Sequence, residues 1–160
     1  MPLIELETKI QSTIEICFDL STSIDLHKLS TAKTNEKAIA GVTSGLIKLN
    51  DFVTWEAIHF GIKQQLKSKI TQYNRPYHFR DEQQKGAFKK FTHEHNFEQV
   101  DDFVIMKDRF YYESPFGIFG TLFNKLVLTN YLKHFLEERN QMIKEYAESE
   151  KWKSIILNYE

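Results

Sequence analysis

Residues 62–70, IKQQLKSKI, alternate between apolar and basic side chains more regularly than any other segment, and this pattern most restricts the fold. Ile62, Leu66 and Ile70 fall on one face of an extended chain, and three lysines fall on the other. This period of two is typical of a β-strand with one buried face. Residues 53–59, VTWEAIH, alternate in the same way. The two segments therefore predict neighbouring strands.

The two residues between these strands, Phe60 and Gly61, predict a tight hairpin turn, because glycine readily adopts the positive φ that such turns require. The apolar faces of the two strands coincide when they are paired across this turn, so the register is self-consistent and predicts an antiparallel sheet. The predicted register pairs His59 with Ile62, Ala57 with Gln64 and Trp55 with Leu66.

A second hairpin is predicted from the segments GAFKKFTHEHNFE and FVIMKDRFYYE, with Val100 and Asp101 as its turn. On the outer face Glu94 then lies opposite Lys107, a pair of opposite charges. On the inner face the register pairs Phe91 with Phe110, His93 with Asp108, His95 with Met106 and Phe97 with Val104. Both faces are consistent with this one register.

Shorter patterns complete the order of elements. Residues 4–10 alternate like a strand, and Ser12 with Glu15 predicts a short helix through a capping box, after which a second short helix is expected. Residues 36–80 predict the other strands, and an apolar stripe at helical spacing predicts one long helix over residues 116–148. Antiparallel strands with helices at the ends of the sheet indicate an α+β fold.

The length of 160 residues predicts one domain, which we place at residues 1–149, followed by a tail at 150–160. Trp152 and the isoleucines of the tail need a surface to pack on, and a second copy of the chain in a homodimer is one candidate. With 21 basic and 22 acidic residues, the chain offers no electrostatic reason to bind nucleic acid. A single cysteine, Cys17, and the lack of a signal-like start or a long apolar run predict a cytoplasmic protein with no membrane span.

Several segments, in their order along the chain, resemble the START/polyketide-cyclase-like superfamily (SRPBCC), and in particular its small bacterial ligand-binding or "cell division" subgroup. The resemblance covers roughly residues 3–148 and depends on EICFDLSTSIDLH, EKAIAGVTSGLI, VTWEAIHFG, the F-x-D of Phe79 and Asp81, GAFKKFTHEHNF, MKDRFYYESPFG and LEERN. It implies a helix-grip fold, as in the major birch-pollen allergen: a curved seven-stranded antiparallel sheet wrapped around a long C-terminal helix, with two short helices after the first strand. It also implies a hydrophobic cavity with its mouth near SPFGIFG, where Gly117 and Gly120 would leave room for a ligand. Because the superfamily includes carriers, receptors and cyclases, the resemblance is not specific about chemistry.

The motif His93-x-His95 has three interpretations. Histidines two apart on a strand point the same way and would suit zinc or iron, with His59 or Asp108 as a third ligand. However, two strands separate His59 from this pair, and the sequence lacks a compact set of further ligands, so no metal and no cofactor are expected. His93 with Asp108 also resembles a carboxylate that orients an imidazole for acid–base catalysis. The third interpretation is a buried pair that satisfies its own hydrogen bonds in the wall of a pocket.

We favour the pocket wall, and hence binding or carriage of a small hydrophobic ligand (a lipid, an isoprenoid or an aromatic molecule) between the sheet and the last helix. One alternative is a cyclase- or dehydratase-type enzyme that uses the pair His93 and Asp108, and another is an interaction protein with a vestigial cavity. No catalytic residue is predicted beyond that pair. The predicted ligand-binding residues are Trp55, His59, Gln64, Leu66, Phe91, His93, His95, Met106, Asp108, Phe110, Tyr112, Phe119, Phe123 and Leu126.

Overall fold

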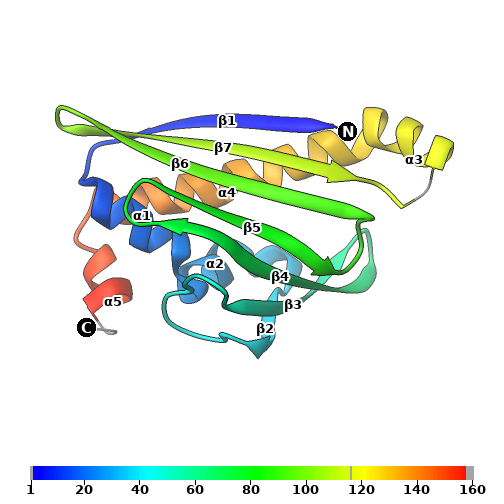
Figure 1. Ribbon diagram of the computed structural model, residues 1–160, viewed down its shortest axis with the longest axis horizontal. Coiled ribbons are helices and arrows are strands. Elements are labelled where there is room, and N and C mark those ends of the chain that lie inside the picture. The colour runs from blue at the N-terminus through cyan, green and yellow to red at the C-terminus, as the bar shows by residue number, and fades with distance from the viewer. Residues whose placement is uncertain (1, 116, 158–160) are drawn as a thin grey trace.

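The computed structural model describes residues 2–115 and 117–157. Its strands form one antiparallel sheet in the order β1-β7-β6-β5-β4-β3-β2, and the sheet curves around the long helix α4 (Figure 1). The predicted α+β architecture, with seven strands and a long C-terminal helix, is confirmed. The strands are β1 (Leu3–Ile10), β2 (Lys37–Gly41), β3 (Phe52–His59), β4 (Ile62–Asn74), β5 (His78–Lys85), β6 (Lys90–Val100) and β7 (Phe103–Glu113), and the helices are α1 (Ile14–Thr22), α2 (Ile24–Ser30), α3 (Gly117–Phe123), α4 (Thr129–Ala147) and α5 (Trp152–Ile156).

The hairpin of β3 and β4 has the predicted register, with Trp55 opposite Leu66 and His59 opposite Ile62. Both turn residues have positive φ, 52° at Phe60 and 73° at Gly61. A two-residue turn of this kind matches the right-handed twist of the two strands. Turn chemistry and strand alternation therefore agree on one pairing.

The predicted register of β6 and β7 is wrong by two residues. His93 lies opposite Phe110 and His95 opposite Asp108, because the turn consists of Asp101 and Asp102. Asp101 takes the positive φ of the turn, 54°, which aspartate tolerates better than most residues. A shift of two residues leaves every side chain on its predicted face, because strand side chains alternate with a period of two. The inner face is therefore as predicted, although the cross-strand partners are not.

The helices differ from prediction in their details. Thr13, and not Ser12, caps α1, because its hydroxyl accepts a hydrogen bond from the backbone N–H of Ile16 at 3.4 Å. The long helix is divided: α3 is followed by a π-helical segment (Asn124–Leu128) and then by α4. A stripe of apolar residues looks the same along the sequence whether one turn of the helix is α-helical or π-helical. The sequence pattern therefore predicted one continuous helix. Phe116, the predicted start of that helix, lies outside the described residues.

The main core lies where α1 and α2 meet the sheet and α4. Phe18 of α1 is fully buried, and its ring packs edge-on against Tyr73, Phe79 and Phe97 of three different strands. The tail joins the same core, since Ile155 of α5 is buried there and α5 packs on α1. The buried isoleucines of the tail are thus covered by their own chain.

Candidate functional site

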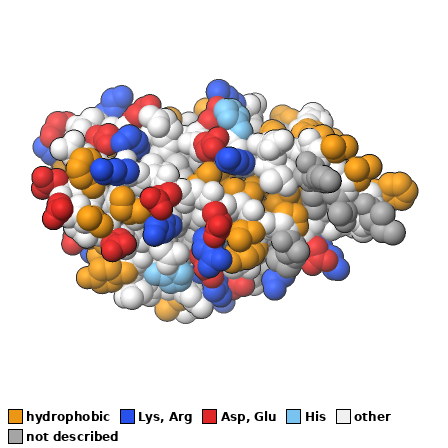
Figure 2. Space-filling model, turned by 90° about the horizontal axis from the view of Figure 1, so that it is seen from above, with side chains coloured by type: hydrophobic (Ala, Val, Ile, Leu, Met, Phe, Trp, Pro, Cys, Tyr) orange, Lys and Arg blue, Asp and Glu red, His pale blue; other side chains and the backbone are white. Residues whose placement is uncertain are grey.

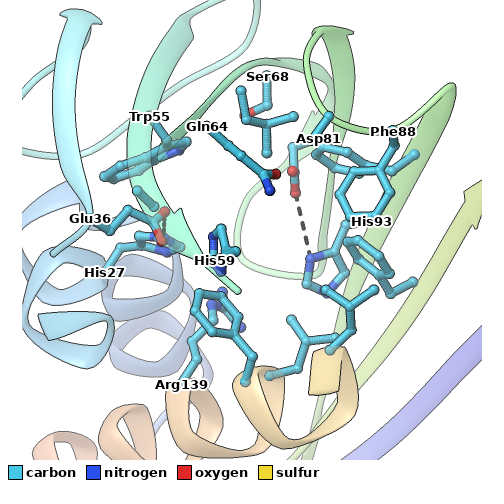
Figure 3. Close-up of a pocket in the computed structure, with 18 of the residues that line it drawn as sticks. His27, Glu36, Trp55, His59, Gln64, Ser68, Asp81, Phe88, His93 and Arg139 are labelled. Atoms are coloured by element: carbon cyan, nitrogen blue, oxygen red, sulfur yellow. Dashed lines mark hydrogen bonds and ion pairs between the residues drawn. The ribbon is translucent and has the colours of Figure 1, made fainter. Parts of the chain in front are cut away.

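A cavity of about 700 Å³ lies between the inner face of the sheet and helix α4 (Figure 3). β3, β4, β5 and β6 form one wall, α4 forms the opposite wall, and α2 contributes to one side. The cavity exists because the inner faces of β3 and β4 carry small or polar side chains, Ala57, Gln64 and Ser68, at positions where a filled core would have large apolar ones. The sheet curves around α4 but does not fill the space beside it.

The lining of the cavity is predominantly apolar and aromatic. Trp55 packs against the imidazole of His27 at a ring-centroid distance of 4.3 Å. Across the cavity, Phe91 and Phe110 stack with their ring centroids 5.3 Å apart. The other apolar residues of the lining are Ile24, Ile47, Val53, Ala57, Phe60, Ile62, Leu66, Ile70, Phe79, Ala87, Phe88, Pro115, Phe123, Leu128, Leu132, Phe135 and Leu136.

Two polar groups face each other across this lining (Figure 3). On one side Nε2 of His27 and a carboxylate oxygen of Glu36 form a hydrogen bond at 2.8 Å. On the other side lie Asp81, His93 and His95. Pockets for small molecules commonly combine apolar walls with a few placed polar groups that orient the ligand.

A third polar contact joins the sheet to α4. Nδ1 of His59 lies 2.6 Å from the hydroxyl of Tyr131 in a hydrogen bond. Burial lowers the pKa of His59, although the charge of Glu36 acts to raise it. The imidazole is therefore neutral at pH 7, and the contact connects the end of β3 to the helix across the cavity.

Asp108 organises the polar cluster behind the cavity wall. It is 1% exposed, and its Oδ1 accepts a hydrogen bond from Nε2 of His93 at 2.9 Å. Its Oδ2 accepts a hydrogen bond from the amide of Asn140 on α4 at 2.7 Å. The guanidinium of Arg139 lies 3.6 Å from Oδ1. One buried carboxylate therefore links β6 and β7 to α4.

Asp81 is the second carboxylate of the cluster, and it lines the cavity (Figure 3). It comes from β5 and lies directly opposite His93 in the register of β5 and β6. Its Oδ1 lies 3.0 Å from Nε2 of His95, within hydrogen-bonding distance, and 3.9 Å from Nδ1 of His93. Asp81 therefore contacts both histidines of the motif.

The charge states within the cluster follow from these contacts. Burial and the neighbouring His95 lower the pKa of His93 to about 4, although Asp108 and Asp81 act to raise it. Burial acts to raise the pKa of Asp108, but the hydrogen bond from His93 and the neighbouring His95 hold it well below its usual range. The pKa of Asp81 is also lowered, because the hydrogen bond from His95 and the nearby His93 outweigh its burial. At pH 7 both carboxylates are ionised and His93 is neutral.

Nine of the fourteen predicted site residues lie in the cavity lining and five do not. Met106, Asp108 and Tyr112 point inward from β7 but are fully buried behind the lining, where the hydroxyl of Tyr112 bonds that of Thr129 at 2.6 Å. Phe119 and Leu126 lie on the surface. The nine in the lining are Trp55, His59, Gln64, Leu66, Phe91, His93, His95, Phe110 and Phe123.

Sequence reasoning missed Asp81, Arg139, and the pair of His27 and Glu36. The sequence did point to Asp81, because the F-x-D motif of Phe79 and Asp81 is one of the segments on which the family resemblance depends. Arg139 occurs in the apolar stripe of the long helix, and a charged residue at such a position usually has a buried partner.

Hydrophobic side chains also gather on the surface at the end of the molecule where α3 lies (Figure 2). Phe119, Leu122 and Leu126 are all more than half exposed. Phe60, itself half exposed, packs edge-on against Phe123 with ring centroids 5.8 Å apart, and both residues belong to the cavity lining. The apolar surface of α3 is thus continuous with one end of the cavity.

Solved structures show which known proteins share this arrangement. A protein from Thermus thermophilus, TTHA0849, superimposes with a TM-score of 0.70 at 17% sequence identity, over 89% of this chain and 97% of that chain. A START superfamily protein from Mycobacterium smegmatis superimposes with a TM-score of 0.68 at 10% identity, over 89% and 97%. The chain has the helix-grip fold. The same fold occurs in the major latex-like protein 151 of Panax ginseng, with a TM-score of 0.65 and 17% identity over 91% and 97% of the two chains.

At these identities the likeness between helix-grip proteins concerns the fold alone. No protein-family model matches the sequence, and no curated protein matches it either. Within the parts of the chain that the structure describes, no helix combines the length and apolar character needed to cross a membrane. What the helix-grip fold does in this chain must therefore be inferred from its own cavity.

Proposed function

We propose that the protein binds a small, largely apolar ligand in the cavity between the sheet and α4. The observation that carries this proposal is the unfilled interior, about 700 Å³ in volume and lined mainly by apolar and aromatic side chains. Ligand pockets typically measure about 300–1,000 Å³ and hold the ligand chiefly by burying apolar surface. The ligand class that suits this lining is a lipid, an isoprenoid or an aromatic molecule.

The polar groups in the lining would orient such a ligand. Asp81, His93 and His95 offer charged and hydrogen-bonding atoms on one side, and the pair of His27 and Glu36 does so on the other. A ligand with an apolar body and a polar group at one end fits this distribution. Burial of its body would provide affinity, and the polar contact would select its orientation.

The size of the cavity argues against a vestigial space. A water molecule occupies about 30 Å³ of liquid, so the interior has room for far more than a few waters. The tail that would serve as an interaction surface instead places Ile155 and Ile156 in the core of its own chain.

An acid–base enzyme is the weaker alternative. His93 and Asp108 are hydrogen-bonded as that hypothesis requires, but Asp108 is buried behind the cavity lining. An imidazole with a pKa of about 4 is a poor base for removing a proton from carbon at pH 7. These observations favour binding over acid–base chemistry at this pair.

The proposal is tested with a fluorescent fatty acid, dansyl-labelled undecanoic acid, whose emission rises and shifts to the blue in an apolar pocket. We expect saturable binding of one probe per chain. Replacing Ala57, a small residue of the lining, by leucine adds three carbon atoms inside the cavity. Displacing about two methylene contacts of the probe, at roughly 0.8 kcal/mol each, should weaken binding about tenfold.

Ala40→Leu provides the matched control, because Ala40 is exposed on β2 and outside the lining. Its affinity for the probe should equal that of the unaltered protein. Equal affinity of Ala57→Leu and Ala40→Leu would place the probe elsewhere on the molecule. Absence of saturable binding by the unaltered protein, together with no small molecule retained in native mass spectrometry, would refute the proposed function.

A further inference from the structure

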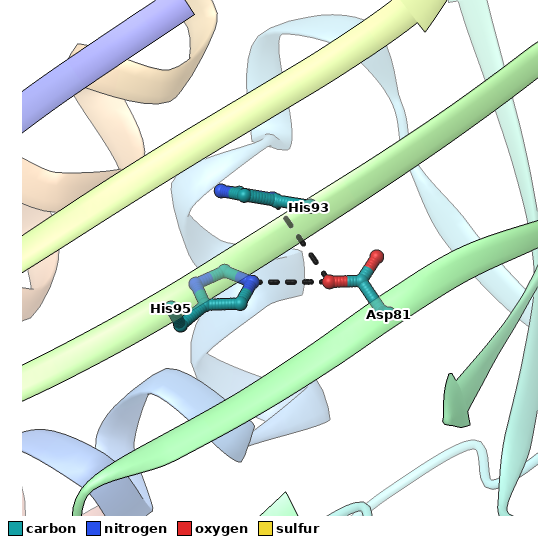
Figure 4. Close-up of side chains that lie close together, drawn as sticks. All are labelled: Asp81, His93 and His95. Carbon is teal, nitrogen blue, oxygen red and sulfur yellow. Dashed lines mark hydrogen bonds and ion pairs between the residues drawn. The ribbon is translucent and has the colours of Figure 1, made fainter. Parts of the chain in front are cut away.

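Three atoms that carry lone pairs converge at one side of the cavity. One ligand atom each from Asp81, His93 and His95 lies within 4.8 Å of the other two (Figure 4). Oδ1 of Asp81 is 3.0 Å from Nε2 of His95 and 3.9 Å from Nδ1 of His93. All three residues belong to the cavity lining, so the point of convergence is reachable from the cavity.

His95 cannot satisfy both of its neighbours as a neutral imidazole. Its Nε2 lies 3.0 Å from Asp81, and its Nδ1 lies 3.0 Å from Oδ1 of Asp108, without the alignment of a hydrogen bond. A neutral ring has one N–H, so in either tautomer a nitrogen lone pair faces a carboxylate oxygen at this distance. A metal ion beside His95 would take up the lone pair that faces the carboxylate.

Asp108 holds the ring of His93 in the orientation that a metal needs, and its Oδ1 also lies 3.0 Å from Nδ1 of His95. Nε2 of His93 donates to Asp108, which leaves the lone pair of Nδ1 on the side of Asp81. If His95 directs its Nδ1–H toward the same carboxylate, its Nε2 is also free on the side of Asp81. A histidine that binds a metal usually donates its other N–H to a carboxylate in this way.

The two rings are also fixed by their apolar neighbours. Phe79 stacks on His95 with ring centroids 4.0 Å apart and an interplanar angle of 11°. Phe110 packs edge-on against His93 at 5.2 Å. Ligands held by packing lose little freedom when an ion binds, so the site is organised before binding.

The charge of the cluster favours a cation. Asp81 and Asp108 are two carboxylates beside a single guanidinium, that of Arg139, so with neutral imidazoles one negative charge remains. A divalent ion would reverse that sign and leave one positive charge for an anionic oxygen from water or from a ligand in the cavity.

We propose that Asp81, His93 and His95 bind a divalent transition-metal ion, such as Zn²⁺ or Fe²⁺, at the wall of the cavity. Two imidazoles and one carboxylate are ligands that suit these ions better than Mg²⁺ or Ca²⁺. Bonds of about 2.0–2.1 Å in a tetrahedral site place ligand atoms about 3.3 Å apart, and Oδ1 of Asp81 lies 3.0 Å and 3.9 Å from the two histidine nitrogens, close to that spacing. Because the three residues line the cavity, the remaining coordination positions would be open to it.

The metal site does not depend on carriage of an organic ligand, so its test uses metal ions alone. Protein freed of metal with a chelator is titrated with Zn²⁺ by calorimetry and with Co²⁺ by visible absorption at pH 7. We expect one ion per chain, and cobalt bands of a site with fewer than six ligands. The result is independent of the Ala57→Leu assay with the fatty-acid probe, so either idea can fail alone.

Asp81→Asn is the most informative variant, because it keeps the shape of the side chain and removes a charge at a position that is not fully buried. It should weaken Zn²⁺ binding at least about 100-fold. That is the upper end of the loss found when a residue that only hydrogen-bonds to a metal ligand is removed, and Asp81 would be a ligand itself. His134→Gln is the control, since His134 is exposed on α4, pairs with Glu138 and lies outside the cavity lining. Its affinity should equal that of the unaltered protein.

A measurement on the unaltered protein covers the case in which Asp81→Asn does not fold. Long-range ¹H–¹⁵N spectra of the imidazoles should show Zn²⁺-dependent shifts at Nδ1 of His93 and Nε2 of His95, and none at His134. No saturable binding, an affinity unchanged by Asp81→Asn, or unchanged spectra of His93 and His95 would overturn the proposal.

Discussion

Replacing Asp108 by alanine should destabilise the protein more than any other change within the polar cluster. The carboxylate is almost fully buried and accepts hydrogen bonds from His93 at 2.9 Å and from Asn140 at 2.7 Å. Arg139, itself 6% exposed, lies 3.6 Å from it. The substitution removes the carboxylate that accepts these hydrogen bonds and pairs with Arg139. The side chains of His93, Asn140 and Arg139 then stay buried without that partner.

The expected magnitude follows from those contacts. A buried donor left without its partner costs about 1–3 kcal/mol, and here two donors, those of His93 and Asn140, lose theirs. Removing one member of a buried ion pair costs about 3–5 kcal/mol, because the remaining charge is uncompensated. Arg139 keeps contacts with Asn140 and with the backbone carbonyl of Ser21, which limits its share. We expect a loss of about 3–5 kcal/mol in the free energy of unfolding, since these costs overlap.

Urea unfolding followed by tryptophan fluorescence measures this loss. With a slope of about 2 kcal/mol per molar urea, the midpoint should fall by about 2 M. Asp102→Ala is the matched control, because Asp102 is an exposed residue in the turn between β6 and β7. Its free energy of unfolding should change by less than about 0.5 kcal/mol. A loss below about 1 kcal/mol for Asp108→Ala would refute the view that this carboxylate holds the sheet to α4.

Two further predictions concern other parts of the fold. Burial, with the charge of Glu148, raises the pKa of the Cys17 thiol to about 12. Ellman's reagent at pH 8 should therefore label Cys17 promptly in the unfolded chain, but in the native protein only when the chain unfolds. Prompt labelling of the native protein would contradict the burial of Cys17. Gly41 and Gly61 both have positive φ, but a Cβ at Gly41 would lie 2.1 Å from the carbonyl oxygen of Phe52, whereas a Cβ at Gly61 meets nothing within 4 Å. Gly61→Ala should therefore lower the free energy of unfolding by about 1–2 kcal/mol, and Gly41→Ala should lower it clearly more. Equal decreases in the thermal unfolding temperature of the two variants would show instead that β2 moves to make room for the added Cβ.

The sequence predicts best where turn chemistry and strand alternation act together. Phe60 and Gly61 restrict the first hairpin to a two-residue turn, and the apolar faces of β3 and β4 then allow one register. The second hairpin lacks a glycine at its turn, so Val100–Asp101 and Asp101–Asp102 were equally compatible with the alternation of β6 and β7. Local chemistry could not choose between two registers that place the same side chains inside.

The candidate site was harder to predict because its residues meet through pairings that the sequence does not fix. β4 and β5 pair with two irregularities, between Lys67 and Ser68 and between Ile70 and Gln72, so the position of Asp81 cannot be counted from a turn. The inward direction of His93 and His95 needed only strand alternation and was predicted. The contact of Asp81 with both of them needed the full sheet.

The two carboxylates of the cluster have different surroundings, and this difference separates support of the fold from the chemistry of the cavity. Asp108 is shielded from the cavity and holds Asn140 of α4, whereas the side chain of Asp81 is 19% exposed, lines the cavity and accepts one hydrogen bond, from His95. A buried ionic network is generally no better for stability than well-packed apolar side chains of similar volume. Stability alone therefore gives no reason to place two carboxylates and two imidazoles where the cavity, the sheet and α4 meet. The proposed binding function would give one, because Asp108 orients His93 while Asp81 lines the cavity, where an ion or a ligand would reach it.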